Sequence, residues 1–186
     1  CIHEFDGEFV PFKDILSECE KYGNADMVFE FASTSKVTLP GAGIACFACS
    51  EANMEYMCKL IGIQAISFDK MNQLRHVKFL QNKEHTLALM KEHAKILKPK
   101  FDMVVSTLER EIAPLGIATW HKPKGGYFVS VNTTPGLAKR TLALCKEAGV
   151  VMTSAGATYP YGHDPLDSNI RVAPSLPPVE ELEQAM

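Results

Sequence analysis

The sequence has no long apolar run and no excess of basic charge. No stretch reaches the ~20 apolar residues of a membrane-spanning helix, and the first residues do not resemble a charged leader followed by an apolar segment. The formal net charge is -3, the pI is about 6.1, and Lys and Arg are scattered. Because nucleic-acid binding needs a basic surface, we expect neither a nucleic-acid partner nor a membrane for this segment. We predict an unexported, cytoplasmic protein that acts on small molecules.

The sequence also lacks the spacing of a disulfide framework or of a metal site. Its six cysteines lie in apolar or helical contexts, which favours a reducing compartment. Cys46 and Cys49 have the spacing of half a zinc site, but their apolar run is typical of a strand, where residues i and i+3 point to opposite faces. A structural zinc site needs a second ligand pair, and none is evident. We therefore predict buried cysteines and no metal.

Apolar residues make up 46% of the 186 positions, which is enough for a packed core. Residues 27–32 and 44–49 form short apolar runs bounded by Ser, Thr, Gly and Pro, as in strands buried on both faces. Residues 11–22 and 53–61 have helical composition. This alternation predicts an α/β sheet in the first part of the chain.

One long amphipathic helix is predicted next, because apolar residues recur every three or four positions from Leu87 to Leu115. Pro99 lies inside the pattern, where it removes a backbone donor and clashes with the preceding turn. We therefore expect a kink or a break near Leu97. Such a helix could connect two domains, and we place the end of the first domain at about Gln81.

The remaining residues have an α+β pattern. Residues 117–121 and 127–131 flank a Gly-rich turn, which predicts two antiparallel strands. A last helix begins after Pro177 and Pro178 and is interpreted as cut short, since barely two turns follow. Between them we predict a helix and two strands, at 138–148, 150–153 and 169–173. The predicted domains are therefore 1–81 and 82–186, the second including the connecting helix.

The segment most indicative of chemistry is Ser33-Thr-Ser-Lys36, which follows a predicted strand and precedes Pro40-Gly-Ala-Gly43. Lys36 could be an ordinary solvated loop lysine. It could also be the base of an S-x-x-K acyl-transfer site, but the accompanying S-D-N and K-T-G motifs are absent. A third interpretation is a Schiff-base lysine, whose neutral amine attacks an aldehyde while Ser33 or Ser35 donates to a phosphate. The tetrapeptide alone leaves all three open.

Three segments, ASTSKVTLPGAGIA, KPKGGYFVSV and SNIRVAPS, occur in the order found in fold-type I pyridoxal phosphate aminotransferases, and the chain resembles that family. It is most similar to the aminotransferases related to the effector domains of MocR regulators, some of which act on aspartate. The resemblance implies the end of the large α/β cofactor-binding domain followed by a small C-terminal α+β domain. It also implies a homodimer that exchanges an amino group between an amino acid and a 2-oxo acid with pyridoxal 5'-phosphate as cofactor.

The resemblance also implies roles for individual residues. Lys36 matches the lysine that bonds the cofactor and shuttles a proton, and Ser33 matches a serine that contacts the phosphate. Arg171 matches the residue that binds the substrate α-carboxylate, and a guanidinium fork fits a carboxylate bidentately. Taken alone, Arg171 would be interpreted as a surface ion-pair former. The implied site is therefore Lys36, Ser33, Ser35 and Arg171.

The sequence departs from the family pattern in two respects. Many relatives carry a phosphate-binding arginine seven or eight residues after the lysine, where this chain has Gly43 and Ile44. The family's remaining cofactor contacts precede the part that matches Cys1, so we expect the segment to be inactive alone. Two alternatives stay open: a lyase or decarboxylase on the same fold, and an amino-acid-sensing effector domain of a MocR-type regulator.

Overall fold

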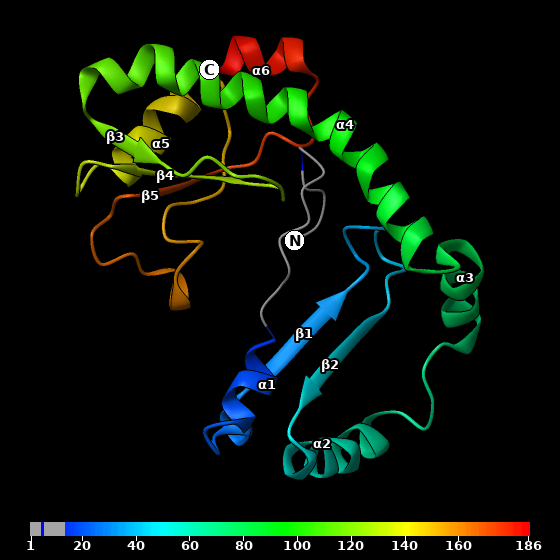
Figure 1. The fold of residues 1–186 in the computed structure, drawn as a ribbon. Coiled ribbons are helices and arrows are strands. Elements are labelled where there is room, and N and C mark those ends of the chain that lie inside the picture. Colours follow the sequence, from blue (N-terminus) through cyan, green and yellow to red (C-terminus); the bar gives the residue numbers. More distant parts are fainter. Residues whose placement is uncertain (1–4, 6–13) are drawn as a thin grey trace. The chain divides into compact units, whose positions relative to one another are not determined.

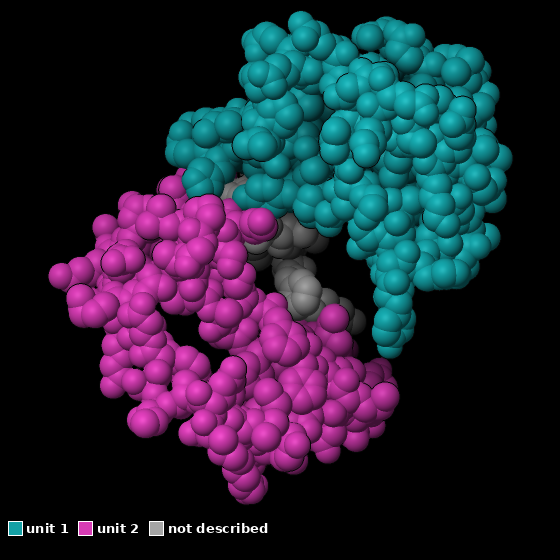
Figure 2. Space-filling view, turned by 180° about the vertical axis from the view of Figure 1, so that it is seen from behind, with its two compact units in different colours: residues 1, 3–8, 91–186 teal, residues 2, 9–90 magenta. Residues whose placement is uncertain are grey.

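The computed structural model describes Phe5 and residues 14–186. These residues divide into two compact units, which Figure 2 colours separately. Unit 2 comprises residues 14–90, and unit 1 comprises Phe5 and residues 91–186, so the division falls inside one long helix. Each unit has its own sheet and is described by itself.

Unit 2 is built around two antiparallel strands with helices before and after them (Figure 1). The prediction that the two apolar runs form strands is confirmed. In the pair, Phe29 lies opposite Cys49 and Ser33 lies opposite Ala45. The predicted helices are also present, although residues 11–13 of the first one lie outside the described residues. The elements are α1 (Ile15–Glu20), β1 (Phe29–Ser33), β2 (Ala45–Cys49), α2 (Glu51–Gln64), α3 (Lys70–Leu80) and the start of α4 (Lys83–Thr107).

Side-chain caps fix where the helices of unit 2 begin. Ser50 accepts from a backbone N–H in the first turn of α2, and Asp69 does the same for α3. At α1, hydrogen bonds from Ser17 to the Asp14 carboxylate lower the pKa of that carboxyl. Helix α3 was not predicted from the sequence, although its Asp69 cap is a readable start signal.

The prediction that these two strands are buried on both faces is wrong. Phe31 is 75% exposed, and Cys46, which we expected to be buried, is exposed as well. The physical reason is that β1 and β2 pair only with each other among the described residues, so neither face of the ribbon is covered as in a larger sheet. All five described cysteines are free, and Cys1 lies outside the described residues.

The long predicted helix is present as α4, but Pro99 does not break it. Proline removes a single backbone donor, whose acceptor would be the Lys95 carbonyl. The nearby side chains of Leu97, Phe101 and Val104 are buried, and their packing holds the helix in place. The regular α-helix ends later, at Thr107, where a π-helical turn begins. In the part of the chain that the structure describes, no helix is both long and apolar enough to cross a membrane.

Unit 1 contains a three-stranded antiparallel sheet, ordered β3-β4-β5, and two further helices (Figure 1). The predicted strand pair, the helix that ends at Gly149 and the last strand are confirmed. The predicted strand at 150–153 is wrong: the Val150 amide bonds to Cys145 O at the end of the preceding helix. The elements are β3 (Ala118–Trp120), β4 (Val129–Thr133), α5 (Ala138–Glu147), β5 (Asn169–Val172) and α6 (Val179–Ala185).

The hydrophobic core lies in unit 1, between one face of α4 and the inner face of the sheet. In β4, buried Val129 and Val131 alternate with exposed Ser130, the pattern of a strand with one covered face. Phe5 packs against Phe101 with their ring centroids 4.8 Å apart. The buried cluster consists of Leu97, Phe101, Val104, Leu108, Val129, Val131, Ala138 and Ile170.

Candidate active site

Lys36 lies in a tight turn immediately after β1. The amides of Val37 and Thr38 both donate to Thr34 O at 2.9 Å, which closes one helical turn around the lysine. The Lys36 side chain is exposed, whereas Val37 beside it is buried. The turn therefore presents the lysine at the surface of unit 2 while its own backbone hydrogen bonds are satisfied.

The loop that follows the turn returns against it at Gly43. A Cβ atom at Gly43 would lie 2.9 Å from Ser35 Oγ and 3.1 Å from the Ser35 backbone N and Cα. Such contacts cannot be relieved by moving a flexible side-chain end, since two of the three atoms are backbone. A side chain at position 43 would therefore require the Ser35 backbone to shift by a few tenths of an ångström.

The two serines flanking Thr34 carry exposed hydroxyl groups beside the lysine. Ser33 Oγ donates to Ser35 Oγ over 3.3 Å. Within the described residues, Ser35 Oγ has no other hydrogen bond, so its own proton remains available to an acceptor. A phosphate oxygen is such an acceptor, and the residues around Lys36 therefore fit the phosphate end of pyridoxal phosphate.

A histidine that the sequence reasoning missed ties this turn to α3. His76 is 4% exposed, and its Nε2 lies 2.9 Å from Thr38 Oγ1 and 3.1 Å from Thr34 Oγ1. Asn72, one turn earlier on α3, donates from Nδ2 to Ala42 O at 2.7 Å. The only signal in the sequence was that Asn72 and His76 follow the Asp69 cap four residues apart. This spacing places both side chains on one face of the helix.

Arg171 lies on β5 in unit 1, half-buried, and opposite Ser130 of β4. Its guanidinium carbon stacks 4.4 Å from the centroid of the Phe128 ring, and its Nη2 donates to Thr153 Oγ1 at 3.3 Å. Its Nε is buried without a hydrogen-bond partner, and no carboxylate among the described residues pairs with the group. An orphaned guanidinium donor fits the carboxylate of a small-molecule ligand.

Polar side chains hold the start of β5 in place. Asn169 is buried, and its side-chain amide donates to Ser130 and Asn132 and accepts from Thr158 over 2.7–3.0 Å. The Asp164 carboxylate accepts backbone N–H groups, and the bond from Asn169 is the main cause of the lowered pKa of this carboxyl. Arg171 therefore stands on a strand whose first residue is fixed from both sides.

The structure thus brings Lys36, Ser33 and Ser35 together in one turn of unit 2. It describes Arg171 separately, in unit 1. The predicted site is accordingly characterised as two half-sites, each with its own supporting contacts.

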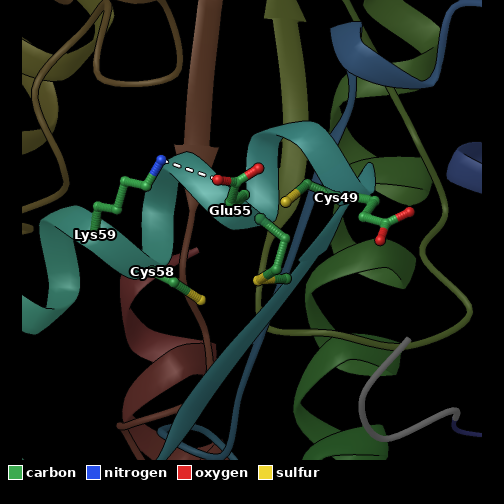
Figure 3. A pocket seen from close by; sticks show the side chains of 6 residues that line it. Cys49, Glu55, Cys58 and Lys59 are labelled. Atoms are coloured by element: carbon green, nitrogen blue, oxygen red, sulfur yellow. Dashed lines mark hydrogen bonds and ion pairs between the residues drawn. The ribbon is translucent and has the colours of Figure 1, made fainter.

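A shallow surface hollow on unit 2 contains none of the predicted site residues. Figure 3 shows it between the end of β2 and α2, with Cys49 and Cys58 and an ion pair of 3.0 Å between Glu55 and Lys59. No group of three or more His, Cys, Asp or Glu able to hold a metal occurs in Phe5 and residues 14–186. We assign the hollow no part in the site.

A family model described as aspartate amino-transferase matches residues 1–186. The chain belongs to this family. It is 44% identical to an aspartate aminotransferase of Corynebacterium glutamicum over 185 residues, which make up 100% of this chain and 43% of that relative. The chain therefore spans less than half the length of this curated relative.

Solved structures of aminotransferases have the same fold. An aspartate transaminase from Corynebacterium glutamicum matches with a TM-score of 0.93 and 43% identity, over 99% of this chain and 43% of that one. An α-aminoadipate aminotransferase from Thermus thermophilus, complexed with N-(5'-phosphopyridoxyl)-L-leucine, matches with a TM-score of 0.76 and 17% identity, over 99% of this chain and 46% of its own. The predicted fold class, the C-terminal part of a fold-type I aminotransferase, is confirmed.

Proposed function

We propose that this chain supplies the cofactor lysine and the substrate-carboxylate arginine of a pyridoxal phosphate-dependent aminotransferase. The reaction transfers an amino group between aspartate, or a similar amino acid, and a 2-oxo acid. The observation that carries the proposal is the turn at Lys36, in which an exposed lysine follows two exposed serines in a chain of this family. An ordinary loop lysine would need neither the closed turn around it nor the close approach of Gly43.

The residues of unit 2 bind the cofactor and move a proton. Pyridoxal phosphate, when bound, supplies the electron sink that stabilises negative charge on the substrate carbon. Lys36 Nζ would hold the cofactor at its aldehyde carbon, and as a free amine it would accept the proton of the substrate α-carbon and return it. Ser35 Oγ would donate its proton to a phosphate oxygen, and Ser33 Oγ would bind a second one by turning its proton away from Ser35 Oγ.

The residue of unit 1 orients the substrate. Phe128 covers one face of the Arg171 guanidinium, and Thr153 occupies one of its N–H groups. The guanidinium N–H groups that do not bond Thr153 would donate to the two carboxylate oxygens. Bidentate binding fixes the substrate carboxylate in both position and angle, and orientation of this kind lowers the barrier to the proton transfer at Lys36.

The other cofactor contacts lie outside these residues, in keeping with a chain that covers 43% of its relative. We therefore propose that catalysis requires the rest of the protein, assembled as a homodimer. The resemblance to the MocR-related aminotransferases favours aspartate as the amino donor.

The test uses the full protein, aspartate and 2-oxoglutarate. We expect glutamate and oxaloacetate as products, and a Lys36→Ala variant without measurable turnover. Lys59→Ala is the matched control, because Lys59 is an exposed lysine of the same unit and its loss should leave the rate unchanged. Release of ammonia or carbon dioxide instead of glutamate would point to a lyase or a decarboxylase. Turnover that persists in Lys36→Ala would exclude the proposed mechanism.

A further inference from the structure

We propose that His76 is a positioning residue for Lys36, and that its imidazole holds the lysine-bearing turn through Thr34 and Thr38. The inference rests on the proposed role of Lys36. His76 belongs to α3, so this role links a helix that contains no predicted site residue to the geometry of the catalytic amine.

The hydrogen bonds of His76 define which ring nitrogen carries a proton. Nδ1 lies 2.9 Å from Asn72 O, and because a carbonyl oxygen only accepts, Nδ1 is the donor. In the neutral ring, Nε2 is then the acceptor for a threonine hydroxyl, with Thr38 the nearer at 2.9 Å and Thr34 at 3.1 Å. Both nitrogens of a ring that is 4% exposed are therefore satisfied, one toward its own helix and one toward the turn.

Thr34 and Thr38 are the two ends of the turn that contains Lys36. The Thr34 carbonyl oxygen accepts hydrogen bonds from the backbone amides of Val37 and Thr38. The Thr34 hydroxyl accepts a hydrogen bond from the backbone amide of Ile44 at 3.0 Å. Thr34 also pairs through its own backbone amide with Ile44 O at 2.9 Å. Fixing these two hydroxyls therefore fixes the turn at both ends, together with the point where the chain enters β2.

Asn72 supplies a second attachment of the same loop to α3. Its Nδ2 donates to Ala42 O, next to the Gly43 that packs against Ser35. The loop is thus held at its start by His76 and at its end by Asn72, both from one face of the helix. Because these bonds are partly buried, breaking one leaves a hydroxyl or a carbonyl without water to replace the lost partner.

Two substitutions of His76 separate its two hydrogen bonds. In His76→Gln, the side-chain oxygen reaches about as far as Nε2 and keeps the acceptor for the threonines. In His76→Asn, the shorter side-chain amide keeps the hydrogen bond to Asn72 O but does not reach the hydroxyls of Thr34 and Thr38. His85→Asn is the matched control, since His85 is an exposed histidine of unit 2 whose side chain takes no part in the network.

The readouts are amide hydrogen exchange of the cofactor-free full protein and steady-state kinetics of the loaded one. In His76→Asn we expect the amides of Val37, Thr38 and Ile44 to exchange about tenfold faster. We also expect kcat to fall on the order of tenfold with little change in KM, because a displaced lysine affects the proton transfer rather than carboxylate binding. His76→Gln and His85→Asn should stay within about twofold of the wild type in both readouts.

The outcomes distinguish this inference from the proposed function. If borohydride reduction fixes the cofactor on Lys36 but His76→Asn exchanges and turns over like the wild type, the inference is overturned and the proposed function stands. If His76→Asn and His76→Gln accelerate exchange equally throughout residues 14–90, His76 is merely structural and the inference is also overturned. If the cofactor is fixed on another lysine, the proposed function fails and the inference fails with it.

Discussion

Unit 1 and unit 2 position their functional side chains by different physical means. In unit 1, Arg171 stands on a strand whose neighbour Ile170 is part of an apolar core that includes α4, β4 and α5. In unit 2, few described residues are buried, and the turn at Lys36 is held by hydrogen bonds from α3. The Arg171 half-site is therefore fixed by apolar burial together with the hydrogen bonds of Asn169, and the Lys36 half-site mainly by a small polar network.

This difference predicts which substitutions should disturb each half-site. Apolar packing distributes its stabilisation over many contacts, so Arg171 should tolerate most single polar changes around it. A network of a few hydrogen bonds is sensitive to the loss of one member. Four predictions test this contrast, beginning with the largest expected effect.

Phe101→Ala should produce the largest loss of stability. Phe101 is among the largest fully buried side chains of unit 1, and its removal leaves a cavity among core residues of α4 and the sheet. We expect a loss of about 3–5 kcal/mol in the free energy of unfolding, measured by urea denaturation of the full protein. Leu176→Ala is the control, since Leu176 is 90% exposed in the same unit and should change stability by less than about 0.5 kcal/mol. Equal effects of the two changes would contradict an apolar core in unit 1.

Gly43→Ala should disturb the Lys36 half-site through backbone contact. The added methyl would meet Ser35 at 2.9–3.1 Å, and we expect a cost of about 1–3 kcal/mol together with less covalently bound cofactor. Urea denaturation and the visible absorbance of the bound cofactor measure the two effects.

Gly62→Ala is the matched control for that change. Gly62 lies in α2, and a Cβ atom there meets no described atom within 4 Å. The same methyl should stabilise the protein by about 0.5–1 kcal/mol, because alanine loses less backbone entropy in a helix than glycine does. Changes of opposite sign in the free energy of unfolding support the close approach of Gly43 to Ser35. Changes of the same sign for both substitutions would refute it.

Phe128→Leu should weaken the Arg171 half-site moderately. The leucine fills similar space but removes the ring that stacks 4.4 Å from the guanidinium carbon. A partly exposed cation–π contact is worth about 0.5–1 kcal/mol, so we expect KM for the amino acid to rise about two- to fivefold with kcat nearly unchanged. Phe128→Tyr keeps the ring and should behave like the wild type. A fall in kcat with unchanged KM would show that Phe128 acts elsewhere than on carboxylate binding.

Asp164→Asn should have the smallest effect on stability, and its difference from the wild type should shrink as the pH falls. Hydrogen bonds from backbone N–H groups, chiefly that of Asn169, lower the pKa of the Asp164 carboxyl below its ordinary value of 3.8. A group with a depressed folded pKa stabilises the protein above its unfolded pKa, and this contribution is lost as the pH falls below about 3.8 toward the folded pKa. Unfolding midpoints measured between pH 6 and pH 3 should therefore fall less in Asp164→Asn than in the wild type. Parallel curves would show that Asp164 does not contribute.

Unit 1 could be predicted largely from its sequence because its patterns are local. Alternating valines mark β4, and Gly149, at a φ of +94°, ends α5 where glycine is expected to stop a helix. The strand expected at 150–153 failed because an apolar run forms a strand only if a partner strand lies beside it. Of the kink or break expected near Leu97, the break does not occur, because core packing on both sides of Pro99 outweighs one missing hydrogen bond.

Unit 2 was predicted less well because its decisive contacts are distant in sequence. Lys36, Ser33 and Ser35 could be selected from their motif, but His76 lies in a helix with no motif of its own. Nothing local indicates that this histidine bonds two threonines preceding it by 42 and 38 positions. The burial expected for β1 and β2 was wrong because, among the described residues, these strands pair only with each other.

The most direct test of the account is to locate the cofactor on the chain. The full protein is reduced with borohydride in the presence of pyridoxal phosphate and digested, and the mass of each lysine-containing peptide is determined. The account predicts a single pyridoxyl adduct, on Lys36, that is absent from Lys36→Ala and retained in Lys59→Ala. An adduct on any other lysine, or an undiminished adduct in Lys36→Ala, would contradict it.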